Sequence, residues 1–222
     1  MEIRTEFHKK LEEIQNDVMA MGSMVAKALL RSVQSLKDRD INLAEGIVAE
    51  DIQINKKRFE TEEKCLELIA TQQPMASDLR IIIGVVSIIT ELERIGDYAE
   101  GIAKIVIMLG NEPPLKRMIN ISRMVEKTVD MLQRSIEALC NHDADTAKKI
   151  VVEDDEVDTL YDDLFRLLVS YMVEDPKTIT RATRLIWVAH NLERAADRVT
   201  NICERVVFIV TGEMEEIGAS KY

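Results

Sequence analysis

The 222-residue chain is poor in aromatic residues (4%), glycine (8 residues) and proline (4 residues). All-β sandwiches and barrels need frequent turns and strands rich in aromatic or β-branched side chains, so this composition argues against them. The background of Leu, Ile, Val, Ala and Glu, together with 11 methionines, favours helices instead. The predicted fold class is therefore all-α.

Long apolar runs are also missing. No stretch approaches the 18 apolar residues that a transmembrane helix needs, so no membrane insertion is expected. Residues 1–6 lack the apolar segment of a signal peptide, which predicts a cytoplasmic location. The three cysteines, Cys65, Cys140 and Cys203, are isolated in the sequence, so neither disulfides nor a thiolate zinc site is expected.

Positive charge is in deficit, because 29 Lys and Arg face 40 Asp and Glu for a net charge of −11. Nucleic-acid binding needs a basic surface and is therefore not expected. The excess negative charge suits a partner with a basic patch, or cations. Solubility alone is the simpler explanation of the same excess.

Sparse breakers divide the chain into six long helical segments. In the first, apolar residues recur in steps of four and three, as in a long helical bundle. Asp40 or Asn42 is the expected N-cap of the second segment, Pro74 is expected to open the third, and Gly212 to end the sixth. The segments are predicted to end at about residues 37, 71, 109, 140, 173 and 211.

The two halves of the chain repeat each other around a strong break at residues 110–114. The sequence LERIGD at 92–97 returns as LERAAD at 192–197, and IVAED at 47–51 returns as IVVED at 150–154. We therefore predict two tandem three-helix bundles of long helices with independent cores, covering residues 1–111 and 112–222. A single six-helix bundle is the alternative.

Carboxylates interrupt the apolar stripes at equivalent places in both repeats. Residues four apart are neighbours on a helix, so these carboxylates come in like-charged pairs that need a cation or a shared proton when partly buried. Asn55 takes the second position of one pair. The candidate ligands on these grounds are Asp51, Glu93, Asp97, Asp154, Asp158, Glu193 and Asp197.

Two alternatives to metal binding remain open for these carboxylates. Arg94 and Arg194 would neutralise them, although Arg94 is turned about 100° away from Glu93, or the stripe is a solvated face. If metal binds, oxygen ligands favour Mg²⁺, Mn²⁺ or Ca²⁺, with iron and zinc also compatible, and facing helices can hold more than one ion. His190 would reach the same cation or serve as a packing residue, and Trp187 is expected in the core.

Several enzyme motifs are missing from the sequence. It has no Walker A motif, no GxGxxG, no HExxH and no serine nucleophile elbow. A ferritin-like di-iron site needs Glu-x-x-His on two helices, and the sequence contains none. Binding is therefore a better expectation than catalysis.

The sequence resembles the PhoU family over nearly its whole length. The most specific segments are QPMASDLR at 73–80, LERIGD at 92–97, AHNLERAAD at 189–197 and NICE at 201–204. The resemblance implies two PhoU-type bundles, each with a surface metal cluster. Its implied ligands are Asp51, Glu93 and Asp97, with Glu100 as a further candidate, and Asp154, Asp158, Glu193 and Asp197, with Asn201 or Glu204 as further candidates.

Two departures from the family pattern concern these clusters. Asn55 stands where the family usually has Asp, so the first cluster has one charge fewer. Arg198 replaces a histidine often found after the second motif, which removes a ligand and adds a positive charge. The second cluster is therefore expected to bind metal more strongly.

The family resemblance implies regulation rather than catalysis. PhoU-like proteins dampen the phosphate-starvation response when phosphate is plentiful, through the ATPase subunit of a phosphate ABC importer and a sensor histidine kinase, and are often homodimers. The cofactors expected are divalent or trivalent metal ions, as single ions or clusters. Alternatives are a carboxylate-bridged metal enzyme or metal store, and a helical adaptor with solvated carboxylates.

Overall fold

The computed structural model describes residues 2–110, 112, 113, 115, 119–215 and 217 of the protein. These residues form long α-helices and one 3₁₀ turn, and none of them lies in a strand. The predicted all-α fold class is therefore confirmed. In chain order the elements are α1 (Glu2–Asp38), α2 (Ile41–Gln72), α3 (Ser77–Leu109), α4 (Ile119–Asn141), α5 (Ala144–Glu174), η1 (Pro176–Thr178) and α6 (Ile179–Thr211).

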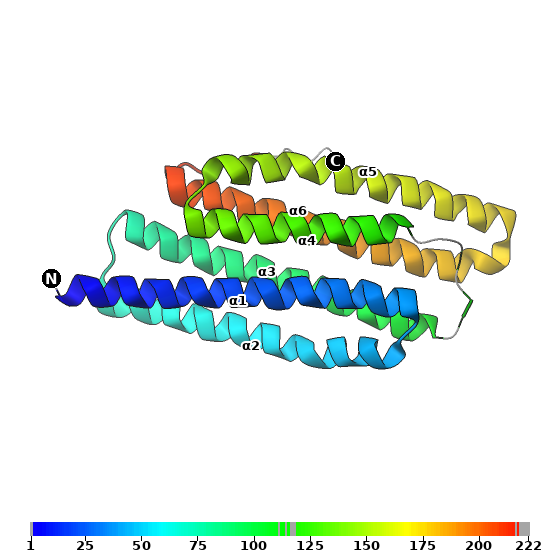
Figure 1. Ribbon diagram of the computed structural model, residues 1–222, viewed down its shortest axis with the longest axis horizontal. Helices are drawn as coiled ribbons and strands as arrows, with labels where there is room; N and C mark the ends of the chain where they lie inside the picture. Colours follow the sequence, from blue (N-terminus) through cyan, green and yellow to red (C-terminus); the bar gives the residue numbers. More distant parts are fainter. Residues whose placement is uncertain (1, 111, 114, 116–118, 216, 218–222) are drawn as a thin grey trace.

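Each half of the chain folds as a three-helix bundle, and the two bundles lie side by side (Figure 1). Helix α1 packs along α4, and α3 packs along α6. These four helices form the middle of an elongated molecule, while α2 and α5 lie at its two edges (Figure 1). The seam between α2 and α3 and the seam between α5 and α6 therefore flank the contact between α3 and α6.

The helix ends follow local chemistry in most places. The Asp40 carboxylate accepts a hydrogen bond of 2.9 Å from the Leu43 N–H, as expected of an N-cap. Gly212 ends α6 with φ of +83°, as predicted. Gly110 lies at the C-terminal end of α3, and two other residues of the predicted break, Asn111 and Pro114, lie outside the described residues.

The beginning of α3 differs from the prediction. The helix begins at Ser77 rather than at Pro74. Ala76 has a positive φ of +44°, and the Asp78 N–H donates to the Met75 carbonyl at 3.1 Å. Residues 74–76 therefore form a turn, and a turn of this kind delays the helix because Ala76 leaves the right-handed helical region.

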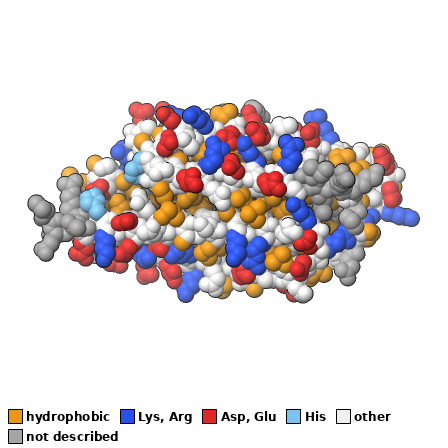
Figure 2. Space-filling model, in the orientation of Figure 1, with side chains coloured by type: hydrophobic (Ala, Val, Ile, Leu, Met, Phe, Trp, Pro, Cys, Tyr) orange, Lys and Arg blue, Asp and Glu red, His pale blue; other side chains and the backbone are white. Residues whose placement is uncertain are grey.

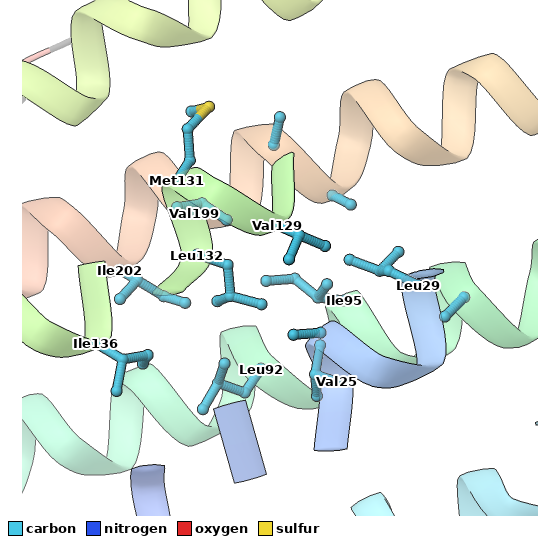
Figure 3. Packing of buried hydrophobic residues seen from close by; sticks show 14 of the residues in the cluster. Val25, Leu29, Leu92, Ile95, Val129, Met131, Leu132, Ile136, Val199 and Ile202 are labelled. Atoms are coloured by element: carbon cyan, nitrogen blue, oxygen red, sulfur yellow. The ribbon is translucent and has the colours of Figure 1, made fainter. Parts of the chain in front are cut away.

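The prediction of two independent cores is wrong. The buried apolar residues form one continuous cluster that runs through both bundles. Figure 3 shows Val25 and Leu29 of α1 and Leu92 and Ile95 of α3 in one packed layer with residues of α4 and α6, among them Val129, Leu132, Ile136, Val199 and Ile202. Helices α1, α3, α4 and α6 bury apolar side chains toward the other bundle as well as toward their own.

Trp187 is also not where the sequence suggested. Its side chain is 52% exposed, whereas Leu185, Val188 and Ala189 around it on α6 are buried. A single apolar residue at the edge of a helical stripe is easily assigned to the wrong face, because neighbouring positions differ by about 100° around the helix. Trp187 therefore belongs to the surface.

On the face shown in Figure 2, acidic and basic side chains are interspersed and apolar side chains gather toward the middle. Cys65 and Cys203 are buried and Cys140 is half-buried, and all three are free thiols. None of the described helices combines the length and apolar composition needed to cross a membrane.

Candidate metal centres

The second carboxylate cluster lies on the seam between α5 and α6. Asp154 and Asp158 come from successive turns of α5, and Glu193 and Asp197 come from successive turns of α6. The charges of Asp158, Asp197 and Glu193 all act on Asp154, so the two helices bring the four predicted carboxylates within electrostatic range of one another.

Burial makes this cluster electrostatically unusual. Desolvation, followed by the charges of the neighbouring carboxylates, raises the pKa of Asp154 to about 7. Desolvation, followed by the charges of Asp197 and Asp158, also raises the pKa of Glu193 to about 7. Burial raises the pKa of Asp197 as well, although the charges of Arg194 and Arg198 oppose that rise. Near neutral pH the cluster therefore lacks enough positive charge nearby to balance it fully.

Two oxygens of the cluster are buried without a hydrogen-bond partner among the described residues, Oδ1 of Asp154 and Oε2 of Glu193. The nearest cationic candidate to the latter is Nδ1 of the exposed His190, at 3.3 Å, a contact without hydrogen-bond geometry. Buried acceptors usually have a partner, so these two oxygens call for an explanation. A bound cation is a chemically suitable one, because hard cations prefer carboxylate oxygens.

The first cluster lies on the equivalent seam between α2 and α3. Asp51 comes from α2, and Glu93, Asp97 and Glu100 come from α3. Burial raises the pKa of Asp51, and the charges of Glu100, Asp97 and Glu93 add to that rise. Burial also raises the pKa values of Glu93 and Asp97. The four residues therefore form a group equivalent to the second one.

The first cluster has more local compensation than the second. The Asn55 amide donates a 2.8 Å hydrogen bond to Asp51, and Lys104 forms a 2.6 Å ion pair with Glu100. Arg58 and Arg94 lower the pKa of Glu93 through their charges, against the effect of burial. Stronger metal binding by the second cluster stays a prediction.

The structure gives Asn201 and Glu204 other partners. The Asn201 amide donates to Glu91 of α3 at 3.4 Å, and Glu204 accepts a 3.1 Å hydrogen bond from the Ile217 N–H. Neither residue is among the groups that shift the pKa values of Asp154, Glu193 and Asp197. The structure thus does not bring these two candidates together with the others.

Arg94 and Arg194, the arginines suggested as neutralising groups, act on the clusters through their charges. Arg94 opposes the rise in the pKa values of Glu93 and Asp97, and Arg194 opposes it for Glu193 and Asp197.

The hydrogen bonds of Arg194 and Arg198 are made to α3. The Arg194 guanidinium donates to the Tyr98 hydroxyl at 3.4 Å, and Arg198 donates to Glu91 at 3.3 Å, so both reach across to α3. This contact between α3 and α6 was not found in the sequence, where Tyr98 and Glu91 lie about a hundred residues from their partners. In the sequence, Glu91 and Tyr98 flank the LERIGD motif, and Arg194 and Arg198 lie in or directly after the LERAAD motif. This position beside the repeated motifs was the only signal for the contact.

The full cation-binding geometry is not preformed. In the part of the chain that the structure describes, no three Asp, Glu, His or Cys side chains are grouped closely enough to hold a metal ion. Like-charged carboxylates repel one another, so side chains on facing helices stay apart without a cation. The donor set is therefore of the kind that a hard cation prefers, while its side chains are spread over two facing helices.

The family assignment follows from comparison with known proteins. The PhoU domain model matches residues 18–106 and again residues 121–206, one match in each bundle. The chain belongs to the PhoU family.

Curated and solved PhoU proteins support the same assignment. The chain is 39% identical over 206 residues to the phosphate-specific transport system accessory protein PhoU homolog of Aquifex aeolicus, covering 93% of each protein. It is 33% identical over 211 residues to PhoU of Escherichia coli, covering 95% of this chain and 88% of that protein.

Two crystal structures share the fold. The phosphate transport system regulatory protein PhoU from Streptococcus pneumoniae matches with a TM-score of 0.88 and 30% identity, over 95% of this chain and 99% of that one. PhoU from Pseudomonas aeruginosa matches with a TM-score of 0.88 and 36% identity, over 93% and 100%.

Proposed function

We propose that this chain regulates phosphate uptake and phosphate-starvation signalling in the cytoplasm, and that it acts by binding rather than by catalysis. Its membership of the PhoU family over nearly the whole chain carries the proposal, because the relatives are named as accessory proteins of a phosphate-specific transport system. A surface of long helices with interspersed charges suits a protein that binds other proteins.

The proposed partners are the ATPase subunit of a phosphate ABC importer and a sensor histidine kinase, with negative regulation when phosphate is plentiful. A homodimer is the proposed assembly. The net charge of −11 supports association with a basic partner surface. Electrostatic attraction of this kind mainly raises the association rate and weakens as salt screens it.

Metal dependence is part of the proposal. Asp154, Asp158, Glu193 and Asp197 would hold the ions of the second cluster, and Asp51, Glu93, Asp97 and Glu100 those of the first. The unpartnered oxygens of Asp154 and Glu193 support this assignment. Bound Mg²⁺, Mn²⁺, iron or zinc would supply positive charge that neutralises the carboxylates.

Pull-down of the purified ATPase subunit and of the kinase cytoplasmic region tests the proposal. We expect binding of both partners, more with Mg²⁺ or Mn²⁺ than with EDTA, and weaker binding as the salt concentration rises. Asp154→Asn with Glu193→Gln is expected to remove the metal effect. Asp162→Asn with Asp163→Asn removes the same amount of negative charge at exposed positions of α5, and this variant is expected to keep the metal effect.

A reporter of the phosphate-starvation response gives an independent measurement. We expect deletion of the gene to raise the reporter signal in high phosphate. Failure to bind either partner, together with an unchanged reporter, would overturn the regulatory proposal and favour the metal enzyme or metal store, which oxidase, phosphatase and ferroxidase assays would then test.

A further inference from the structure

Three arginines meet at the end of the molecule where the chain passes from one bundle to the other. Arg39 lies in the turn between α1 and α2, while Arg181 and Arg184 lie in the first turns of α6. Figure 1 places the end of α1, the end of α3 and the beginning of α6 at this same end. The three side chains thus come from both bundles and surround the described part of the linker.

The only carboxylate that these arginines contact among the described residues is that of Glu112. Arg181 Nε lies 3.5 Å from one of its oxygens, and Arg184 Nη1 lies 3.4 Å from the other. Charge-assisted hydrogen bonds normally measure about 2.7–2.9 Å. The Glu112 carboxylate is also 44% exposed, so it is a loosely held anion.

The other contacts of the three arginines are to backbone carbonyls. Arg39 donates to the Glu112 carbonyl, Arg181 to the Pro113 carbonyl at 2.8 Å and Arg184 to the Met108 carbonyl at 2.7 Å. Each guanidinium has five N–H donors. The contacts described use no more than two nitrogens of any one of them, so donors remain for a further acceptor.

The three guanidiniums share few carboxylate partners. In a protein of net charge −11, the contacts described for them include one carboxylate, that of Glu112. A cavity of about 30 Å³ lies here, lined by Arg39, Glu112 and Arg181 above apolar side chains of α1, α3 and α6. An apolar floor strengthens electrostatic attraction by lowering the local dielectric.

We propose that this arginine cluster (Arg39, Arg181 and Arg184) is a binding site for a small tetrahedral oxyanion, of which inorganic phosphate is the type, and that Glu112 occupies it as a tethered competitor. The planar guanidinium fork matches the geometry of phosphate as well as that of a carboxylate. The small cavity, bordered by the linker backbone, favours a free anion over a phosphate group carried on a protein. The site is separate from both carboxylate clusters.

Calorimetric titration of inorganic phosphate into metal-free protein, prepared with EDTA and measured at low salt, tests the site independently of the metal proposal. We expect Glu112→Gln to bind phosphate at least about threefold more tightly than the unmodified protein, because a competitor is removed. Arg181→Gln with Arg184→Gln is expected to weaken binding at least about tenfold, since each charged hydrogen bond contributes that much.

Matched variants keep the test decisive. Arg123→Gln with Arg166→Gln removes the same charge at exposed positions of α4 and α5 and should bind phosphate as the unmodified protein does. Arg39→Gln, in the other bundle, replaces the double variant if circular dichroism shows that the latter is unfolded. A phosphoserine peptide is titrated in parallel.

Three results would overturn the proposal. The first is no phosphate binding by either the unmodified protein or Glu112→Gln. The second is unchanged affinity in the folded arginine variants. The third is tighter binding of the phosphoserine peptide than of phosphate, which would make the site a docking point for a phosphorylated protein. None of these results bears on the metal clusters.

Discussion

Individual acidic residues on the seam between α5 and α6 combine burial with a shortage of nearby cations. Asp154 has pKa-raising neighbours on both helices, and one of its oxygens has no partner among the described residues. The Glu193 side chain is only 17% exposed. Residues of this kind weaken the metal-free protein, and a cation that binds them removes the penalty.

Replacing Glu193 by Gln together with Asp197 by Asn should lower the metal content of the natively purified protein by about half or more, since the cluster expected to bind metal more strongly loses two of its four carboxylates. The protein should remain folded, because both substitutions keep the side-chain shape. Elemental analysis of protein made without an affinity tag measures the effect. Asp162→Asn with Asp163→Asn is the control, and an unchanged metal content in the first variant would remove these residues from the ligand set.

The raised pKa values of Asp154 and Glu193 predict a pH dependence of the metal-free protein. Folding lifts both pKa values from 3.8 and 4.5 to about 7, so between about pH 4 and 7 the folded state binds more protons than the unfolded state. Their contribution to stability therefore falls as the pH rises through this range. Asp154→Asn with Glu193→Gln should flatten this trend in the melting temperature measured from pH 5 to 8; an equal slope in both proteins would contradict the assignment.

The candidate carboxylates could be found from sequence because the spacing of four residues fixes which side chains share a helix face. The partners of Asn201, Glu204, Arg194 and Arg198 could not, because each depends on where a second helix lies. Helical periodicity identifies the helix face on which a side chain lies. It does not identify the residue of another helix that the side chain contacts.

Among the helices, the contact of α3 with α6 depends on a close approach at Gly84. A Cβ atom at this position would lie 2.5 Å from Cδ1 and Cγ1 of Ile209. Gly84→Val should therefore destabilise the protein by about 1–3 kcal/mol, the usual cost of overfilling a packed core. Urea unfolding measures the change.

Gly46 on α2 provides the matching control. A Cβ atom there has its nearest neighbour, the Arg31 guanidinium, at 4.0 Å. Gly46→Ala should stabilise the protein by roughly 0.5–1 kcal/mol through helix propensity alone. If Gly84→Val were as stable as the unmodified protein, the two helices would not be in the close contact described.

Local signals predicted most helix ends correctly. Asp40 carries a side chain that caps a helix, and Gly212 accepts a positive φ at little cost. The beginning of α3 was wrong because Ala76 has a positive φ that its own chemistry does not favour. Such a conformation is imposed by the surrounding chain, and the sequence alone does not reveal it.

For the whole molecule, the continuous core predicts that the two bundles unfold together. Val129, Ile136, Val199 and Ile202 of the second bundle pack with α1 and α3 of the first (Figure 3). Calorimetry should show one cooperative transition. Residues 112–222 produced alone should unfold or self-associate, because separation exposes these apolar side chains; a stable monomeric half would show that the shared core contributes little.

The repeated sequence motifs correctly indicated two related bundles, but they did not show how the bundles join. An apolar stripe records that a surface is buried, and a partner in the same bundle or in the other satisfies it equally well. Residues such as Leu92 and Ile95 are fully buried for this reason near the contact of the bundles. The joining of the two cores required the structure.

The exposed position of Trp187 has a practical consequence. It is the single tryptophan of the chain, and it lies on α6 three residues before His190 and six before Glu193. Tryptophan fluorescence therefore arises from one place only, on the helix that carries Glu193 and Asp197 of the second cluster, while the first repeat has no tryptophan. Intrinsic fluorescence of Trp187 can therefore report ligand binding in the second repeat without a chemical label, and it distinguishes that binding from binding in the first repeat.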